Sequence, residues 1–465
     1  MKTVITKFDD ENIYNLKTTN TTIKKEYGLT KEIIEAISKE KDEPSWVLDI
    51  RLKALDLFYS MEDPTWGPDI SYLDINKIAT YVKSIDKEKR SWEEVPEDIK
   101  NVFDKLGIPE AEKENLAGVG AQYDSEVVYH NISEKVKEKG VIYTNFDVAI
   151  KEYPELVKQY FTKAVPLIDH KYIALHYALF SGGSFVYVPK GTKLDLPLQS
   201  YFRLNEKGAG QFEHTLIIVE EDASLQFIEG CSAPGYNDLN LHAGCVELFV
   251  KKNAYLRFST IENWSKNMLN LNTKKCIVDE SGTIEWIMGS FGSKVSMLYP
   301  LSILNGNKAK CEMTAISFAG KGQNLDTGLK VICNAENNSV NVNSKSISKD
   351  GGICTFRSNV HVKKNAPHAK VNMSCESLML DSISRSDTIP VNNIENDTVE
   401  YSHEASIGKI SEDVIYYLMT RGLSEEDAKG LIVRGFAEPI AKVFPVEYAV
   451  EMNRLIDLEL EGTIG

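Results

Sequence analysis

Up to about residue 130, apolar side chains recur at the three- and four-residue spacing of helices. The run from Leu48 to Phe58 forms one apolar face, and Ser45 stands where it can cap that helix. Pro96 opens a second helical run, which Gly107 ends. The pattern predicts an N-terminal helical domain over residues 1–135.

From about residue 180 the apolar period changes to two, the period of strands. The alternating pairs are Leu225/Phe227, Leu256/Phe258, Ile284/Trp286, Val340/Val342 and Val371/Met373. Many strands begin with a small residue after a polar one, as in Asp222-Ala223, Asn253-Ala254, Ser281-Gly282, Lys308-Ala309 and Gly351-Gly352. The first four of these small residues are 31, 28 and 27 residues apart.

A recurrence of about 30 residues, with about two strands in each repeat, is typical of a coiled stack of strands. Strand runs in a β-sandwich can also recur. No helix-length pattern separates these strands, however, which argues against a doubly wound sheet. We therefore expect a mainly β protein whose core, residues 136–410, is a parallel β-helix.

The helical period returns at about residue 411. One helix is expected over 411–422, and a second from the box-like Ser424-x-x-Asp427 to just before Gly435. A third is expected from Val446 to Leu460.

This C-terminal helical domain, residues 411–465, could cap the open edge of the strand stack. It could equally present a docking face for a partner. The anchors of such a face would be Val433, Phe436, Ile440 and Val443.

The formal charge of −15 over 465 residues argues against nucleic acid or an anionic membrane as the main partner. The first residues lack the apolar run of a signal peptide, and no stretch approaches the roughly 18 apolar residues of a membrane span. We therefore expect a cytoplasmic protein, in a compartment that keeps thiols reduced.

All seven cysteines lie between Cys231 and Cys375, and none forms a Cys-x-x-Cys pair. A zinc knuckle or a self-contained ferredoxin site is therefore not expected, and any sulfur chemistry belongs to the central region. The five cysteines between Cys231 and Cys375 alternate with apolar residues or lack a motif, and we expect them to be structural. The same holds for His130, His170 and His176, whereas His214 and His242 are ambiguous.

Cys231 is followed by Ser-Ala-Pro-Gly, so it stands where a strand gives way to a loop. A partner could reach such a thiol, and nearby cations would favour its thiolate. The alternative is a buried small apolar residue, the usual state of a free cysteine. Cys375 alternates with Val371 and Met373, which favours the core, but the polar run at 382–387 could end the strand close to it.

The chain has no Gly-x-x-x-x-Gly-Lys-Ser/Thr loop, so it should not hydrolyse ATP by itself. It also lacks a Gly-x-Ser-x-Gly elbow and a His-Glu-x-x-His helix. If the function needs ATP hydrolysis, another subunit must supply it.

Several long segments carry a resemblance that covers nearly the whole chain. They are GVGAQYDSEVVYH at 118–130, PLQSYFRLN at 197–205, FEHTLIIV at 212–219, EGCSAP at 229–234, SCESL at 374–378, HEA at 403–405 and RGLSEEDA at 421–428. Together they closely resemble the SufB/SufD family of the SUF iron–sulfur cluster assembly system, and its SufB branch in particular. The resemblance implies a right-handed parallel β-helix between helical domains, in agreement with the periodicity.

In that family the cysteine matching Cys231 accepts persulfide sulfur, and further residues line the route of the sulfur along the β-helix. The matching positions here are Arg203, Asn205, Glu262, Trp264 and Lys274. The resemblance makes Cys375, His403 and Glu404 the ligand region of a nascent, transient iron–sulfur cluster. Some members have glutamine in place of Glu262, and a glutamate in place of Ser402, so this chain departs from them at both positions.

The resemblance also implies partners. These are an ABC-type ATPase like SufC, which docks on the helices after 411, a SufD-like paralogue or a second copy of the chain, and a cysteine desulfurase or its sulfur-relay protein. A reduced flavin bound to the complex could supply electrons.

The resemblance thus implies a scaffold for iron–sulfur cluster assembly that is not itself an enzyme, and two other functions compete with it. A SufD-like structural partner would share the fold without accepting sulfur, but Arg203, Asn205, Cys231 and Cys375 favour SufB. A β-helix enzyme acting on carbohydrates could use Asp279, Glu280 and Glu285, which solvated turns explain better. The scaffold requires Cys231 open to a donor and Cys375 near a subunit boundary. Dry, sealed packing of both would exclude it.

Overall fold

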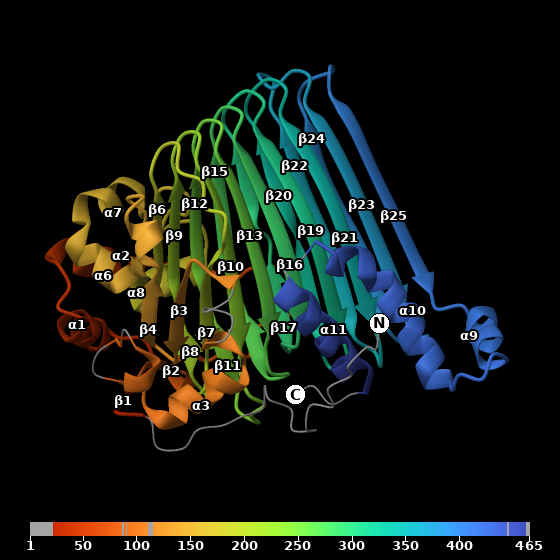
Figure 1. The fold of residues 1–465 in the computed structure, drawn as a ribbon, viewed down its shortest axis with the longest axis horizontal. Helices are drawn as coiled ribbons and strands as arrows, with labels where there is room; N and C mark the ends of the chain where they lie inside the picture. Colours follow the sequence, from red (N-terminus) through yellow and green to blue (C-terminus); the bar gives the residue numbers. More distant parts are fainter. Residues whose placement is uncertain (1–21, 86–87, 90, 110–114, 444–445, 462–465) are drawn as a thin grey trace.

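The computed structural model describes residues 22–85, 88–89, 91–109, 115–443 and 446–461 (Figure 1). Its helices are α1 (Lys31–Glu40), α2 (Ser45–Ser60), α3 (Glu97–Lys105), α5 (Glu134–Lys137), α6 (Phe146–Glu152), α7 (Pro154–Tyr160), α8 (Lys171–Leu179), α9 (Glu412–Met419), α10 (Glu425–Ala441) and α11 (Val446–Glu461). No helix within the described ranges is both long and apolar enough to span a membrane.

The strands before residue 240 are β1 (Lys24–Tyr27), β2 (Ala79–Lys83), β3 (Gly118–Tyr123), β4 (Glu126–Ile132), β5 (Ile142–Asn145), β6 (Gly183–Val188), β7 (Leu198–Arg203), β8 (Gly210–Gln211), β9 (His214–Val219) and β10 (Ser224–Ser232). The next strands are β11 (Asn240–His242), β12 (Cys245–Val250), β13 (Tyr255–Asn263), β14 (Met268–Asn270), β15 (Thr273–Val278), β16 (Thr283–Phe291), β17 (Val295–Leu298) and β18 (Leu301–Leu304). The last are β19 (Lys310–Ala319), β20 (Asn324–Cys333), β21 (Ser339–Ser348), β22 (Ile353–Val362), β23 (Lys370–Met379), β24 (Arg385–Ile394) and β25 (Glu400–Lys409).

The core is a parallel β-solenoid built from two facing sheets, as the periodicity predicted (Figure 1). The first sheet has the order β25-β23-β21-β19-β16-β13-β10-β7-β3-β4, and all its pairs are parallel except β3 with β4. The second sheet contains β6, β9, β12, β15, β18, β20, β22 and β24, with the short strands β8, β11, β14 and β17 along it.

The predicted recurrence comes from one corner of the solenoid, where each turn needs a residue with positive φ. These residues are Asp222, Asn253, Ser281, Lys308, Asn337 and His368. Gly351-Gly352 does not belong to this series, because it forms the opposite corner between β21 and β22. The fifth repeat of this corner is at Asn337, and the pattern of a small residue after a polar one does not reveal it, because the next residue is the polar Asn338. Asn338 is buried and donates a hydrogen bond to the Gly306 carbonyl oxygen.

Inward-facing apolar side chains stack in columns along the solenoid axis. One column, in unbroken register, is Leu225, Leu256, Ile284, Cys311, Val340 and Val371. All belong to one buried cluster. In the next column the rings of Phe227 and Phe258 stack with centroids 5.6 Å apart. Cys311 is thus a core residue, as expected.

The cross-section of the solenoid narrows along the chain. In the earlier turns the side opposite the first sheet is made of two strands, such as β17 and β18. In the next turn the single long strand β20 pairs with both of them. The N-terminal turns therefore enclose a wider interior than the C-terminal ones.

Helices cover the outer faces of both sheets. Apolar residues of α2, α6, α7 and α8 pack on the second sheet at the N-terminal turns. Val433 and Ile440 of α10, with residues of α11, pack on outward isoleucines of the first sheet, so these two anchors are occupied within the chain. The prediction that this helix ends before Gly435 was wrong. A methyl side chain at position 435 would meet no neighbouring atom within 4 Å, so Gly435 is an ordinary position on the helix surface. Burial of α10 against the sheet stabilises the helix as far as Ala441.

We expect Leu256→Ala to lower the free energy of unfolding by about 2–5 kcal/mol, because Leu256 is fully buried in a close-packed column. The matched control is Leu196→Ala, whose side chain is 47% exposed and which should change stability by less than about 0.5 kcal/mol. Denaturant unfolding followed by circular dichroism measures both. Equal effects of the two variants would contradict the packing described above.

Candidate functional site

The inward face of the first sheet changes from apolar to polar along each strand. In β10, Leu225 and Phe227 are followed at the same period by Glu229 and Cys231. In β13, Leu256 and Phe258 are followed by Thr260 and Glu262, and Glu262 lies beside Cys231 in the ladder. The wide N-terminal turns therefore enclose a layer of polar side chains above the apolar core.

These side chains form one connected group, which we call the interior polar cluster. Its members are Glu213, Glu229, Cys231, His242, Glu262, Asn270 and Lys274, and each is at least 97% buried. The ammonium of Lys274 lies 2.5 Å from Glu229 Oε1 and 3.8 Å from Glu262 Oε1. Asn270 Nδ2 donates to Glu262 Oε2 over 2.6 Å.

His242 closes the cluster on the other side. Its Nδ1 donates to Asn270 Oδ1 over 2.8 Å and its Nε2 donates to Glu213 Oε1 over 2.5 Å. Asn270 donates its amide N–H to Glu262, so its Oδ1 is the acceptor for Nδ1–H of His242. The Glu213 carboxyl favours a second proton on Nε2. Burial alone would lower the pKa of His242, but Glu213 opposes burial and raises that pKa above its ordinary value. Three buried acidic side chains thus face Lys274 and His242.

Cys231 lies at the end of a strand, as predicted, but its thiol is covered. Its side chain is 1% exposed and belongs to a buried apolar cluster that also includes Trp264 and residues of β2. Burial, followed by the charges of Glu229, Glu213 and Glu262, raises the pKa of Cys231 well above its ordinary value, against the opposing effect of Lys274. The expectation that cations favour the thiolate here was therefore wrong, because burial and the three acidic side chains together outweigh Lys274.

The other predicted route residues do not all surround this thiol. Trp264 shares its apolar cluster, and Glu262 and Lys274 belong to the interior polar cluster. Arg203 pairs in register with Ser232, so it lies on the opposite face of the sheet, where its Nη1 donates to Ser232 Oγ over 3.0 Å. Asn205 follows β7 and donates its backbone N–H to Asp124 Oδ1 over 2.7 Å.

Cys375 and His403 meet across the last two strands of the first sheet. Cys375 Sγ lies 3.6 Å from His403 Nε2, and the thiol is 3% exposed whereas the imidazole is half-buried. Burial raises the pKa of Cys375 to about 12 and lowers the pKa of His403. The strand does not end near Cys375, as the polar run suggested, since β23 continues to Met379. It is the last turn of the solenoid that brings this thiol near an edge.

Glu404 does not join this pair. It follows His403 directly in β25, so it points to the opposite face and is exposed. The structure thus brings together two of the three predicted cluster ligands.

Sequence reasoning missed Glu213 and Glu229, and a second buried group formed by His176, His214 and Cys245. Glu229 could have been found, because the alternation that put Leu225 inward also puts Glu229 and Cys231 inward. His176 comes from a helix distant in sequence from the two strands, so no local pattern indicated it.

The carboxylates considered for carbohydrate chemistry do not form a groove. Asp279 and Glu280 pair with Lys251 and Lys252 at a corner, and Glu285 pairs with Arg257 on the outer face of the first sheet. These are solvated ion pairs, in agreement with the preferred interpretation.

We expect Cys231 to react slowly with iodoacetamide in the isolated folded chain near pH 8, because its thiol is covered and protonated. Glu229→Gln removes the negative charge that raises the pKa of Cys231 most, so it should speed the reaction at this thiol. Glu285→Gln, on the outer face of the sheet, should not change the rate. Peptide mass spectrometry measures the rate at this site. Labelling of native Cys231 as fast as that of unfolded protein would contradict the burial.

Two comparisons with known proteins agree with each other. Residues 202–436 match the family described as SUF system FeS cluster assembly, SufBD core domain, and residues 122–200 match the SufBD protein N-terminal region. The chain is 53% identical over 440 residues to an iron–sulfur cluster assembly SufBD family protein of Staphylococcus epidermidis. It is 52% identical over 440 residues to the iron–sulfur cluster assembly protein SufB of Bacillus subtilis. Each alignment covers 95% of this chain and 95% of the relative. The chain therefore belongs to the SufB/SufD family of the SUF iron–sulfur cluster assembly system.

Proposed function

We propose that this protein is a scaffold on which iron–sulfur clusters are assembled, with sulfur accepted at Cys231 and the nascent cluster held by Cys375 and His403. The observation that carries the proposal is the 3.6 Å approach of Cys375 Sγ to His403 Nε2 on the last two turns. Both thiols are covered and belong to apolar clusters, but Cys231 is also a member of the interior polar cluster and Cys375 contacts an imidazole.

Two mixed ligands suit a cluster that must be passed on. Iron prefers thiolate and accepts imidazole, and a site with four cysteines would hold its cluster more firmly. Iron would displace the proton of Cys375, whose thiol is otherwise neutral. Two ligands are too few for a cluster, so we expect the remaining ones from a second subunit at the same edge.

That edge favours a partner of the same fold. β25 ends the first sheet, and the side chains of Ile389, Val391, Ile394 and Ile407 on β24 and β25 are exposed. An uncovered parallel edge with apolar residues is a template for further pairing. A SufD-like paralogue or a second copy of this chain would cover it.

A second exposed apolar surface lies on the C-terminal helices. Its residues are Val414, Tyr416, Tyr417 and Met419 of α9 and Leu431 of α10. These residues, rather than Val433 and Ile440, are available to a SufC-like ATPase.

Sulfur would reach Cys231 from the persulfide of a desulfurase or its relay protein. The sulfur of Cys231 would attack the terminal sulfur of the donor persulfide, the donor S–S bond would break, and the thiol proton of Cys231 would pass to the departing donor cysteine. This step requires the apolar cluster around Cys231 to open, because the thiol is 1% exposed. The anionic persulfide would then find Lys274 and the buried indole N–H of Trp264.

A column of hydroxyl groups joins the two thiol sites. In the parallel ladder Cys231 is followed by Glu262, Ser290, Ser317, Ser346 and Ser377. Ser377 lies two residues from Cys375, and the five steps span about 24 Å at the usual strand spacing. The predicted route residues all lie before β16, so they serve the receipt of sulfur and the serines serve its onward passage. A void of about 10 Å³ lies along the column between Ser290 and Ser317.

Only a small species could use such a path. Two electrons and one proton convert the Cys231 persulfide into thiolate and hydrosulfide, and a reduced flavin or an external thiol would supply the electrons. Hydrosulfide is small and accepts hydrogen bonds from serine hydroxyls.

We expect Cys375→Ala and His403→Ala to weaken the charge-transfer absorption that the protein acquires with iron, sulfide and reductant under anaerobic conditions. Glu404→Ala, one residue from His403 but on the opposite face, should leave most of that absorption. Mössbauer spectroscopy would identify the iron species. A larger loss with Glu404→Ala than with His403→Ala would overturn this ligand assignment.

We expect Ser317→Val to block the column while Cys231 still takes up sulfur, since the added methyl groups fill a buried position between the two thiols. With labelled cysteine and a desulfurase, label should persist on Cys231 and cluster formation should fall several-fold. Thr314→Val, on the outer face of the same strand, is the control. Undiminished cluster yield in Ser317→Val would exclude this route.

A further inference from the structure

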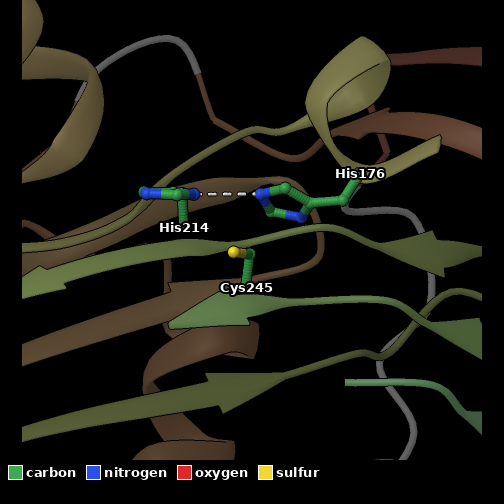
Figure 2. A group of neighbouring side chains, drawn as sticks. All are labelled: His176, His214 and Cys245. Atoms are coloured by element: carbon green, nitrogen blue, oxygen red, sulfur yellow. Dashed lines mark hydrogen bonds between the residues drawn. The ribbon is translucent and has the colours of Figure 1, made fainter. Parts of the chain in front are cut away.

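A second group of metal-binding side chains lies outside the interior of the solenoid. His176 projects from α8, while His214 and Cys245 begin the adjacent strands β9 and β12 and pair in register. All three are buried, and their ligand atoms lie within 4.8 Å of one another (Figure 2). The group lies where α8 covers the outer face of the second sheet, apart from the thiols of the proposed assembly sites.

The backbone carbonyl of Ala243 determines which ring nitrogen of His176 carries the proton. Its Nδ1 lies 2.9 Å from the carbonyl oxygen of Ala243, which can only accept, so Nδ1 carries the proton. In the neutral ring Nε2 then has a lone pair. This lone pair points at His214 Nδ1, 3.0 Å away (Figure 2).

His214 faces an acceptor on each side. Its Nε2 lies 3.4 Å from Glu247 Oε2, and the Glu247 carboxylate accepts backbone N–H groups of Thr162, Ala164 and Val165 at 2.8 Å each. If Nε2 carries the proton towards Glu247, then Nδ1 and His176 Nε2 oppose each other as two lone pairs. If Nδ1 carries it, a bare Nε2 faces Glu247, and without a metal only a proton on that buried carboxyl would relieve the repulsion.

A cation between the two rings removes this conflict. Histidine that binds a metal with one nitrogen typically donates its other N–H to a carboxylate or a backbone carbonyl. Glu247 and the Ala243 carbonyl are such acceptors, one for each ring. Figure 2 shows the sulfur of Cys245 beside the line that joins the rings, where it would be the third ligand.

We propose that His176, His214 and Cys245 bind a structural zinc ion that ties α8 to the second sheet. Two imidazole nitrogens and one thiolate suit this borderline-soft ion, which requires the nitrogens to separate by only a few tenths of an ångström from their present 3.0 Å. A water molecule completes the coordination. Binding releases the thiol proton of Cys245. This site is independent of the proposed assembly function.

The test is the metal content of the full chain, produced in zinc-supplemented medium and purified without a histidine tag or chelator. We expect about one zinc per wild-type chain by mass spectrometry, and at least a ~10-fold lower content in Cys245→Ser. Cys276→Ser, a buried thiol in the adjacent strand β15, and Cys375→Ser should both retain the ion. Protein produced with cobalt should show thiolate-to-cobalt absorption that only Cys245→Ser removes.

The wild-type measurements stand even if Cys245→Ser fails to fold. A chelator should lower the melting temperature of the zinc-loaded wild-type chain. Wild-type protein with less than about a tenth of a zinc per chain would overturn the proposal, with a proton on His214 taking the place of the metal. Zinc that remains in Cys245→Ser, or leaves with Cys375→Ser, would overturn it as well.

Discussion

Parallel pairing in unbroken register is the constraint on which this structure depends. From β10 to β23 each residue of one turn lies beside one residue of the next, without a bulge in the first sheet. A shift by one residue in any turn would exchange the inward and outward faces of the strand. The same register that stacks leucine on leucine also aligns Cys231 with the serines and sets Cys375 beside the strand of His403.

The register places chemistry and stability on the same strands. The first half of each inward face holds the apolar core, and the second half of the N-terminal strands holds buried charge. Burying three carboxylates with Lys274 and His242 costs desolvation that apolar residues would not incur. Buried groups with strongly shifted pKa values, such as Cys231 and His242, are more frequent at functional sites than elsewhere.

Much of the solenoid could be predicted from the sequence, because every turn makes the same local demands on its residues. Polar residues followed by small ones at one corner, and apolar residues at period two, can be recognised in the sequence without knowledge of the fold. The covering of Cys231 could not be predicted, since β2 lies far upstream and its contacts depend on the whole N-terminal region. The opposite faces of His403 and Glu404 were implied by the period of two, but the family resemblance grouped them by sequence proximity instead. The apposition of His176 with two strand residues depends on tertiary packing alone.

The merging of β17 and β18 into β20 has a consequence for direction. Turns with three strands precede this junction and turns with two strands follow it, so Cys231 and Cys375 lie on opposite sides of it. In the scaffold proposed above, a finished cluster at Cys375 would be far larger than the void of about 10 Å³ lined by Ser290 and Ser317. Such a cluster would therefore leave across the exposed edge at β25, where a neighbouring subunit would stand, and not through the interior.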